Sequence, residues 1–279
     1  MLAPQPSPCP SWQAHIELQF ARRGPRTAIV GRRHAGPLRI QRPFYPEGEV
    51  CHTYLLHPPG GVVGGDELSI DLAVAEHGHA LLTTPGAAKF YRSAGALASQ
   101  RQHFKVGAGA TLEWLPQDTI LFSGSEVHSQ CRIDLTGDAR FIGWELLCFG
   151  RPAGAAPYDA GRCRQGLALY RDDAPLVIER GHYEAGGALM GAAWGLQGHS
   201  VSGTLLASGA DTETLERARR VALPETAGRL ACTLMEDVLV CRVLSHHAEP
   251  ARHAFIHIWQ AIRPRLLGRE ASPPRIWNT

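Results

Sequence analysis

Acidic side chains interrupt apolar stretches of this chain at several places. Glu113, Glu145 and Glu179 each lie inside an apolar run, and Asp66 directly follows a glycine-rich segment. Because side chains alternate between the two faces of a strand, each acid faces either water or an interior. A buried carboxylate needs a hydrogen-bonding partner or a cation, so acids that share one interior would line a polar path. For each acid taken alone, the water-facing interpretation is favoured.

Histidine is the second residue type here that could bind a metal, with fourteen copies in the chain. His253 and His257 have the i,i+4 spacing of metal ligands on a helix, but the glutamate of a metalloprotease helix is absent between them. Their positions lie nearly opposite the apolar stripe of the same helix. A solvent-facing or interface role is therefore favoured over a metal site, and a hydrolytic metal centre is not supported.

The glycine-rich segment 58–65 contains two Gly-Gly pairs around Val62 and Val63. Its spacing matches neither a P-loop nor a dinucleotide-binding motif, and Lys89 is not followed by Ser or Thr. A hairpin corner is the favoured interpretation. The chain also lacks a G-x-S-x-G nucleophile motif, so no nucleophilic catalysis is predicted.

The elements that must position these residues are predominantly short strands. Segments of alternating or apolar residues recur about every ten residues, with turn signals between them. The predicted strands are 15–20, 26–30, 38–41, 50–56, 68–74, 101–106, 111–115, 119–122, 130–135, 140–148, 167–170, 176–180, 188–194, 201–207, 230–234 and 238–244. Such a rhythm indicates an all-β sandwich, barrel or solenoid, although no strict repeat is visible.

Two helices are expected in the last third of the chain. The first spans 212–223, with Asp211 or Thr212 as its N-cap, and the second spans 250–267. Pro264 is expected to kink or end the second helix. Since no linker is evident, residues 13–279 are predicted to form one domain after a flexible, proline-rich tail at 1–12.

Composition excludes several function classes. With 44% hydrophobic and 19% charged residues the chain is globular, and a net charge of +2 gives no reason to expect a nucleic-acid partner. Its seven cysteines lack a C-x-x-C pair, which indicates buried thiols in a reducing compartment. Neither a signal peptide nor a membrane-spanning run is present, so a cytoplasmic location without a membrane partner is expected.

Five blocks of this sequence are longer and more specific than generic motifs: 59–66, 83–93, 112–122, 144–151 and 263–277. Together these blocks resemble the UreD family of urease accessory proteins, called UreH in some bacteria. They follow the order of the family and cover nearly the whole chain after about residue 12. The signature positions are Gly60, Gly61, Gly64, Gly65, Pro85, Gly86, Lys89, Tyr91 and Arg92.

The resemblance implies an all-β, β-helical scaffold of stacked strands with two helices and no catalytic activity of its own. It implies a urease maturation factor that binds apo-urease, recruits accessory protein F and, through F, the GTPase accessory protein G. No tightly bound cofactor is expected. Ni²⁺ would be carried transiently, and many weak oxygen or imidazole sites suit transit better than one tight cage.

Particular residues acquire roles through the resemblance. An internal nickel path is expected to use Asp66, Glu145 and Glu179, where Glu145 replaces the aspartate frequent in relatives. Ala87 and Ala88 replace a more polar pair expected in some relatives. The residues expected at the interface with accessory protein F are His253, His257, Trp259 and Arg263.

Two other functions are compatible with the residues. One is an all-β hydrolase or carbohydrate-binding protein that uses a pair of acids. The other is a purely structural adaptor without metal traffic, which differs from a nickel conduit only in what Asp66 and Glu145 do.

Overall fold

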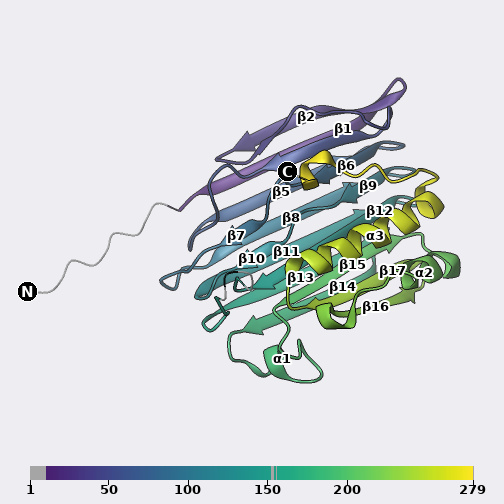
Figure 1. The fold of residues 1–279 in the computed structure, drawn as a ribbon. Helices are drawn as coiled ribbons and strands as arrows, with labels where there is room; N and C mark the ends of the chain where they lie inside the picture. Colours follow the sequence, from purple (N-terminus) through teal and green to yellow (C-terminus); the bar gives the residue numbers. More distant parts are fainter. Residues whose placement is uncertain (1–10, 152–153, 155, 279) are drawn as a thin grey trace, which may run out of the picture.

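Two β-sheets stacked face to face form the body of the protein in its computed structural model, which describes residues 11–278 apart from 152, 153 and 155 (Figure 1). In order across the first sheet, the strands are β14 (Ala174–Glu184), β13 (Gly161–Arg171), β11 (Ser125–Leu135), β8 (Ala98–Val106), β5 (Glu67–Val74), β1 (Gln13–Arg23) and β2 (Arg26–Ala35). The second sheet has the order β16 (Gly228–Met235), β17 (Val238–Ser245), β15 (Val201–Ser208), β12 (Arg140–Phe149), β9 (Thr111–Trp114), β6 (His79–Thr83), β4 (Cys51–Leu56) and β3 (Arg39–Ile40). Two short strands, β7 (Ala88–Phe90) and β10 (Thr119–Leu121), pair beside β12.

The chain alternates between the two sheets as it advances. Strand β5 is followed by β6 in the other sheet, β8 by β9, and β11 by β12, through four-residue turns at 75–78, 107–110 and 136–139. Each turn closes with a hydrogen bond from its last residue to its first, with N···O distances of 3.0, 3.0 and 3.1 Å. Parallel neighbours therefore stack without crossover helices, which gives the predicted all-β, solenoid-like scaffold.

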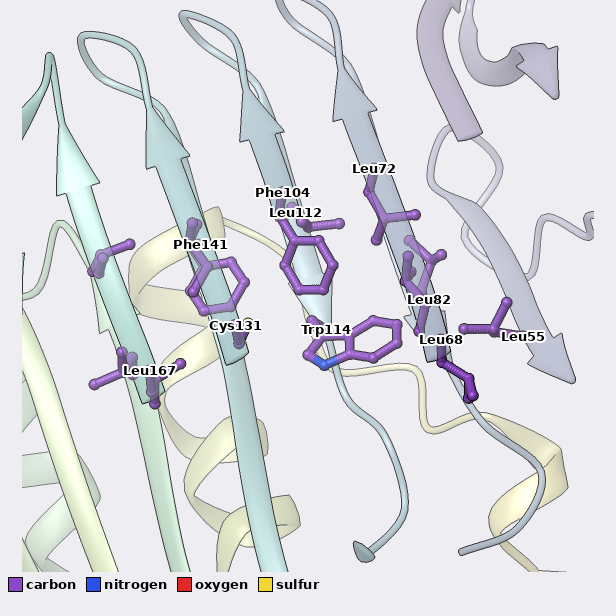
Figure 2. Packing of buried hydrophobic residues seen from close by; sticks show 14 of the residues in the cluster. Leu55, Leu68, Leu72, Leu82, Phe104, Leu112, Trp114, Cys131, Phe141 and Leu167 are labelled. Atoms are coloured by element: carbon purple, nitrogen blue, oxygen red, sulfur yellow. The ribbon is translucent and has the colours of Figure 1, made fainter. Parts of the chain in front are cut away.

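The space between the sheets holds the larger hydrophobic core. Inward side chains of adjacent strands lie in register, as Leu72 and Phe104 do on β5 and β8, and Leu112 and Phe141 on β9 and β12 (Figure 2). Phe104 and Trp114 come from opposite sheets, and their ring centroids are 5.1 Å apart. Burial of these apolar rows removes surface from water and holds the sheets together.

A second core lies between the outer face of the second sheet and the helices. Helix α3 (Ala248–Leu267) crosses β12, β15 and β17 (Figure 1), and its predicted apolar stripe of Phe255, Ile258, Trp259 and Ile262 is fully buried. Helix α2 (Thr212–Arg219) packs on α3 and β16, and Asp211 caps it by accepting a 2.9 Å hydrogen bond from the Thr214 amide. Two 3₁₀ turns follow the helices, at Glu225–Ala227 and Arg275–Asn278.

Several predicted elements differ in the structure. The segment expected as a strand at 188–194 instead contains the short helix α1 (Ala188–Gly191), because its glycines and alanines offer little to pack on a sheet. Pro264 lies inside α3, which continues to Leu267 and ends at Gly268 in a left-handed conformation. Helix α2 ends at Arg219, short of residue 223, and β6 and β7 were not expected. Residues 1–10 of the predicted tail lie outside the described residues.

Among the described helices, none combines the length and apolar character needed to cross a membrane. All six described cysteines are buried free thiols, as predicted.

A buried network of charges fixes α3 on the second sheet. Glu113 of β9 is fully buried and accepts hydrogen bonds from Trp259 Nε1 (2.6 Å) and from Arg263 Nε and Nη2 (both 2.9 Å). His79 Nε2 lies 2.7 Å from the same carboxylate, and Arg263 also binds Glu47. Burial on its own raises the pKa of Glu113, but His79 and Arg263 outweigh it and lower the pKa to about 2.

Removing the charge of Glu113 is expected to destabilise the fold strongly. In Glu113→Gln the guanidinium of Arg263 stays buried with half of its acidic partners, and the free energy of unfolding should fall by about 3 to 5 kcal/mol. Urea denaturation measures this change. The control is Glu213→Gln, which removes an exposed ion pair to Arg217 and should change stability by about 0.5 kcal/mol or less. Equal stability of the two variants would contradict this role for Glu113.

Candidate functional site

A cavity of about 290 Å³ lies in the interior between the two sheets. Loop residues 57–62 and 84–89 form one part of its wall, and Trp114, Phe141 and Glu145 form another. Most of the wall is apolar. Its polar side chains are His57, Thr84, Lys89, Gln100, Gln102, Gln117, Thr119 and Glu145.

The glycine-rich segment builds this wall by pairing with β7. Val62 donates a 2.7 Å hydrogen bond to the Lys89 carbonyl, and Tyr91 donates from its amide to the Val62 carbonyl at 2.8 Å. A Cβ atom at Gly61 would lie 2.4 Å from the Tyr91 ring, so only glycine allows this approach. The predicted hairpin corner is wrong, because 58–65 connects strands of different sheets.

The other signature positions surround the same loop. The Tyr91 hydroxyl donates to the Gly60 carbonyl at 3.0 Å, and a Cβ at Gly64 would lie 2.2 Å from Ser93 Oγ. Gly65 has a φ of +97°, which favours glycine. Pro85, Gly86 and Lys89 line the cavity, whereas Arg92 lies against Gly124, outside the lining.

Glu145 places a carboxylate in the interior between the sheets. Trp144, its neighbour on β12, points the other way, and its ring lies tilted against that of Phe255 of α3, with centroids 6.2 Å apart. Glu145 accepts a 2.8 Å hydrogen bond from Gln165 Nε2 of β13. Burial raises the pKa of Glu145 to about 7, the nearby charge of Glu179 adds to this shift, and the hydrogen bond from Gln165 opposes it. This carboxyl therefore exchanges its proton near neutral pH.

A second cavity, of about 940 Å³, lies where β14 and β16 end the two sheets. Gln165, Glu179 and Arg242 contribute to its wall together with Glu145. Glu179 is ion-paired with Arg242, at 2.5 Å between Oε1 and Nη2. Since Glu145 is the one described residue that lines both cavities, its carboxylate marks the place where they adjoin.

Asp66 occupies a different position from the one expected. Its Oδ1 accepts a 2.9 Å hydrogen bond from the Trp12 amide, and its Oδ2 accepts one of 3.0 Å from the Val63 amide. It does not line either cavity among the described residues. The geometry therefore assigns Asp66 to holding the glycine-rich loop, whereas Glu145 and Glu179 lie in cavity walls.

Two thiols lie close to Glu145 but are poor ligands. Burial raises the pKa of Cys131 and Cys163, and the charge of Glu145 raises both further, so each remains a protonated thiol. Within the described ranges, no three His, Cys, Asp or Glu side chains are grouped to hold a metal. The described part of the interior therefore offers single carboxylates instead of a grouped set of metal ligands.

The four residues expected at a partner interface separate into two groups. His253 and His257 are exposed on α3. Trp259 and Arg263 are fully buried and bind Glu113, so their predicted interface role is wrong. Trp259 belongs to the buried apolar stripe, and Arg263 follows it by one helical turn on the same side.

Sequence reasoning missed the amides that face the cavities. Gln100 and Gln102 share the inward parity of Ala98, Phe104 and Val106 on β8, and this alternation would have placed them inside. Gln165 shares the inward parity of Cys163, Leu167 and Leu169 on β13 in the same way, but nothing local in the sequence names its partner Glu145 on the opposite sheet. The network around Glu113 was likewise not foreseen.

Comparisons with known proteins agree on one family. The family model described as UreD urease accessory protein matches residues 13–278. Urease accessory protein UreD of Dechloromonas aromatica is 45% identical over 281 residues, covering 99% of this chain and 97% of its own. The UreD proteins of Alkalilimnicola ehrlichii (48%, covering 99% of this chain and 95% of its own) and Pseudomonas aeruginosa (46%, covering 97% and 96%) are similar throughout.

The proton on Glu145 should make stability depend on pH. The folded protein holds this proton up to about pH 7, whereas the unfolded chain releases it near 4.5. The free energy of unfolding of the wild type should therefore fall by about 3 kcal/mol relative to that of Glu145→Gln as pH rises from about 4.5 to 7, with no further change above pH 7. Urea denaturation at a series of pH values tests this, with exposed Glu184→Gln as the control. A stability difference that is constant with pH would contradict the assignment.

Proposed function

Because the chain belongs to the UreD family of urease accessory proteins, we propose that it is a maturation factor that passes Ni²⁺ toward the urease active site. In this proposal it binds apo-urease and recruits accessory protein F and, through F, the GTPase accessory protein G. It acts without catalytic activity of its own, as a scaffold with an internal ion path.

The position of Glu145 is the observation that carries the proposal. Its carboxylate adjoins both cavities, the interior one walled by the signature loops and the more open one walled by the last strands of the sheets. An ion that moves through the interior would meet this carboxylate, and Glu179 stands further along the same wall. The family signature residues thus shape one cavity of the path that Glu145 connects.

The chemistry of this carboxylate suits passage better than storage. A divalent cation favours the ionised form of Glu145, so arrival of the ion releases a proton and departure takes one up. At neutral pH the proton competes with the cation, because the pKa is about 7. Glu179 is balanced by Arg242, which competes with a cation there. Weak, separate sites allow an ion to leave as readily as it enters.

The scaffold role predicts a stable complex. The full chain, co-expressed with apo-urease and accessory protein F, should co-purify with both in one species on size-exclusion chromatography. Accessory protein G should join when F is present and should be absent when F is omitted. A folded chain that binds neither apo-urease nor F would overturn the scaffold role.

The conduit role predicts a separable effect of Glu145. Glu145→Gln keeps the shape and the hydrogen-bonding capacity of the side chain but removes its charge, so the complex should assemble while the nickel content of urease falls severalfold. Elemental analysis of urease purified from cells expressing each variant measures this.

The matched control is Glu184→Gln, an exposed acid on β14, the strand that carries Glu179. It should leave nickel content unchanged. If Glu145→Gln also leaves the nickel content unchanged, the chain is an adaptor without an ion path.

A further inference from the structure

The exposed side of α3 carries two histidines arranged as a pair. His253 and His257 are four residues apart, both are exposed, and both lie away from the buried stripe of the helix. Their ring centroids are 6.4 Å apart and the ring planes differ by 27°. Among the described residues, the one side-chain interaction that either ring makes is with the other ring.

We propose that His253 and His257 form a surface site for a divalent transition-metal ion. Imidazole nitrogen suits Ni²⁺, Cu²⁺ and Zn²⁺, and an i,i+4 pair on a helix places two imidazoles on one side of a single ion. Water completes the coordination shell, because the described residues nearby supply no third grouped ligand. That the physiological ion is Ni²⁺ rests on the function proposed above, whereas metal binding by the pair does not.

The helix presents the pair in a fixed geometry. The buried bonds of Trp259 and Arg263 to Glu113 hold the turns of α3 that follow His257 on the sheet. The backbone of the two ligands is therefore ordered before an ion arrives, which reduces the entropy lost on binding.

Neighbouring charges are compatible with a bound cation. Arg252 points to the sheet, where Nη1 donates to Gln117 Oε1 at 2.6 Å and lies 3.5 Å from Asp118 Oδ1. Glu249, exposed one turn before His253, adds negative charge on the same side of the helix. Arg265, two turns after His257, is ion-paired with Asp211.

Helix α3 touches the cavity wall through Arg252, on a different face from the histidine pair. Gln117, which Arg252 contacts, lines the cavity walled by the signature loops. The histidine pair itself lies on the solvent side of α3, so the helix separates it from that wall. A two-histidine site with water ligands binds weakly enough to release its ion, which fits a collection point on the surface.

Another histidine pair in the structure serves as a comparison. The rings of His199 and His246 are stacked face to face, with centroids 4.4 Å apart and planes at 20°. At this separation the rings touch, so no ion fits between them, and His199 Nδ1 is bound to the Leu196 carbonyl. Replacing both histidines of this stacked pair therefore controls for the loss of histidines outside α3.

Isothermal titration of NiCl₂ into the untagged, full-length chain tests the proposal. His253→Gln and His257→Gln should each weaken one Ni²⁺ site by about tenfold or more, because the second imidazole binds as an intramolecular ligand. The double variant His257→Gln/Gln260→His keeps two imidazoles but separates them by seven residues, and it should bind as weakly as His257→Gln. Circular dichroism checks that each variant is folded.

The controls separate this site from the interior path. His199→Gln/His246→Gln and Glu145→Gln should leave the α3 site unchanged. Wild-type Ni²⁺ affinity in both His253→Gln and His257→Gln would overturn the proposal, and so would full binding by the seven-residue pair. Loss of the site in Glu145→Gln alone would assign it to the cavity and overturn the α3 site, while leaving the conduit intact.

Discussion

The ion pair between Arg263 and Glu113 is the interaction on which the position of α3 depends. Both side chains are fully buried, and each is satisfied by further partners: His79 and Trp259 on one side, Glu47 on the other. Buried charges are tolerated only when every group is paired in good geometry, so this network specifies one placement of the helix on the sheet. The apolar stripe of α3 supplies burial but could slide by a turn; the charges do not allow it. The second core and the exposed face of α3 both follow from this constraint.

The buried carboxylate between the sheets differs from the one at the α3 interface in its partners and in its pKa. Glu113 has cationic partners, and its pKa is held low, whereas Glu145 has a neutral amide, and burial holds its pKa near 7. The first carboxylate is permanently charged and structural. The second changes its charge under ordinary conditions, at a cost in stability above its pKa. A residue that destabilises the fold in this way is more readily explained by function than by packing.

The glycine-rich loop connects these features. Its pairing with β7 requires Gly61 beneath the Tyr91 ring, and Asp66 ties the loop to the start of β1 through backbone amides. The longest signature of the sequence therefore has a steric explanation: it shapes the wall of a cavity. The acid within it, Asp66, serves the same loop. The cavity that this loop walls is also lined by the Glu145 carboxylate.

Local signals in the sequence predicted the strand rhythm, the all-β class, α2 and the buried stripe of α3. They were sufficient because hydrophobic periodicity and helix-capping residues are encoded within a few positions. They also placed Glu145 and Glu179 among the candidates. The tertiary structure decided which way each acid points, because alternation along a strand leaves two possible faces. The position of α3 gives Glu113 its ion pair with Arg263, and the position of the first sheet opposite Glu145 places that acid in a cavity wall. The interface role expected for Trp259 and Arg263 came from the family resemblance, and the burial of both side chains contradicts it. Their true partner, Glu113, is some 150 residues earlier in the chain, and no local pattern connects them.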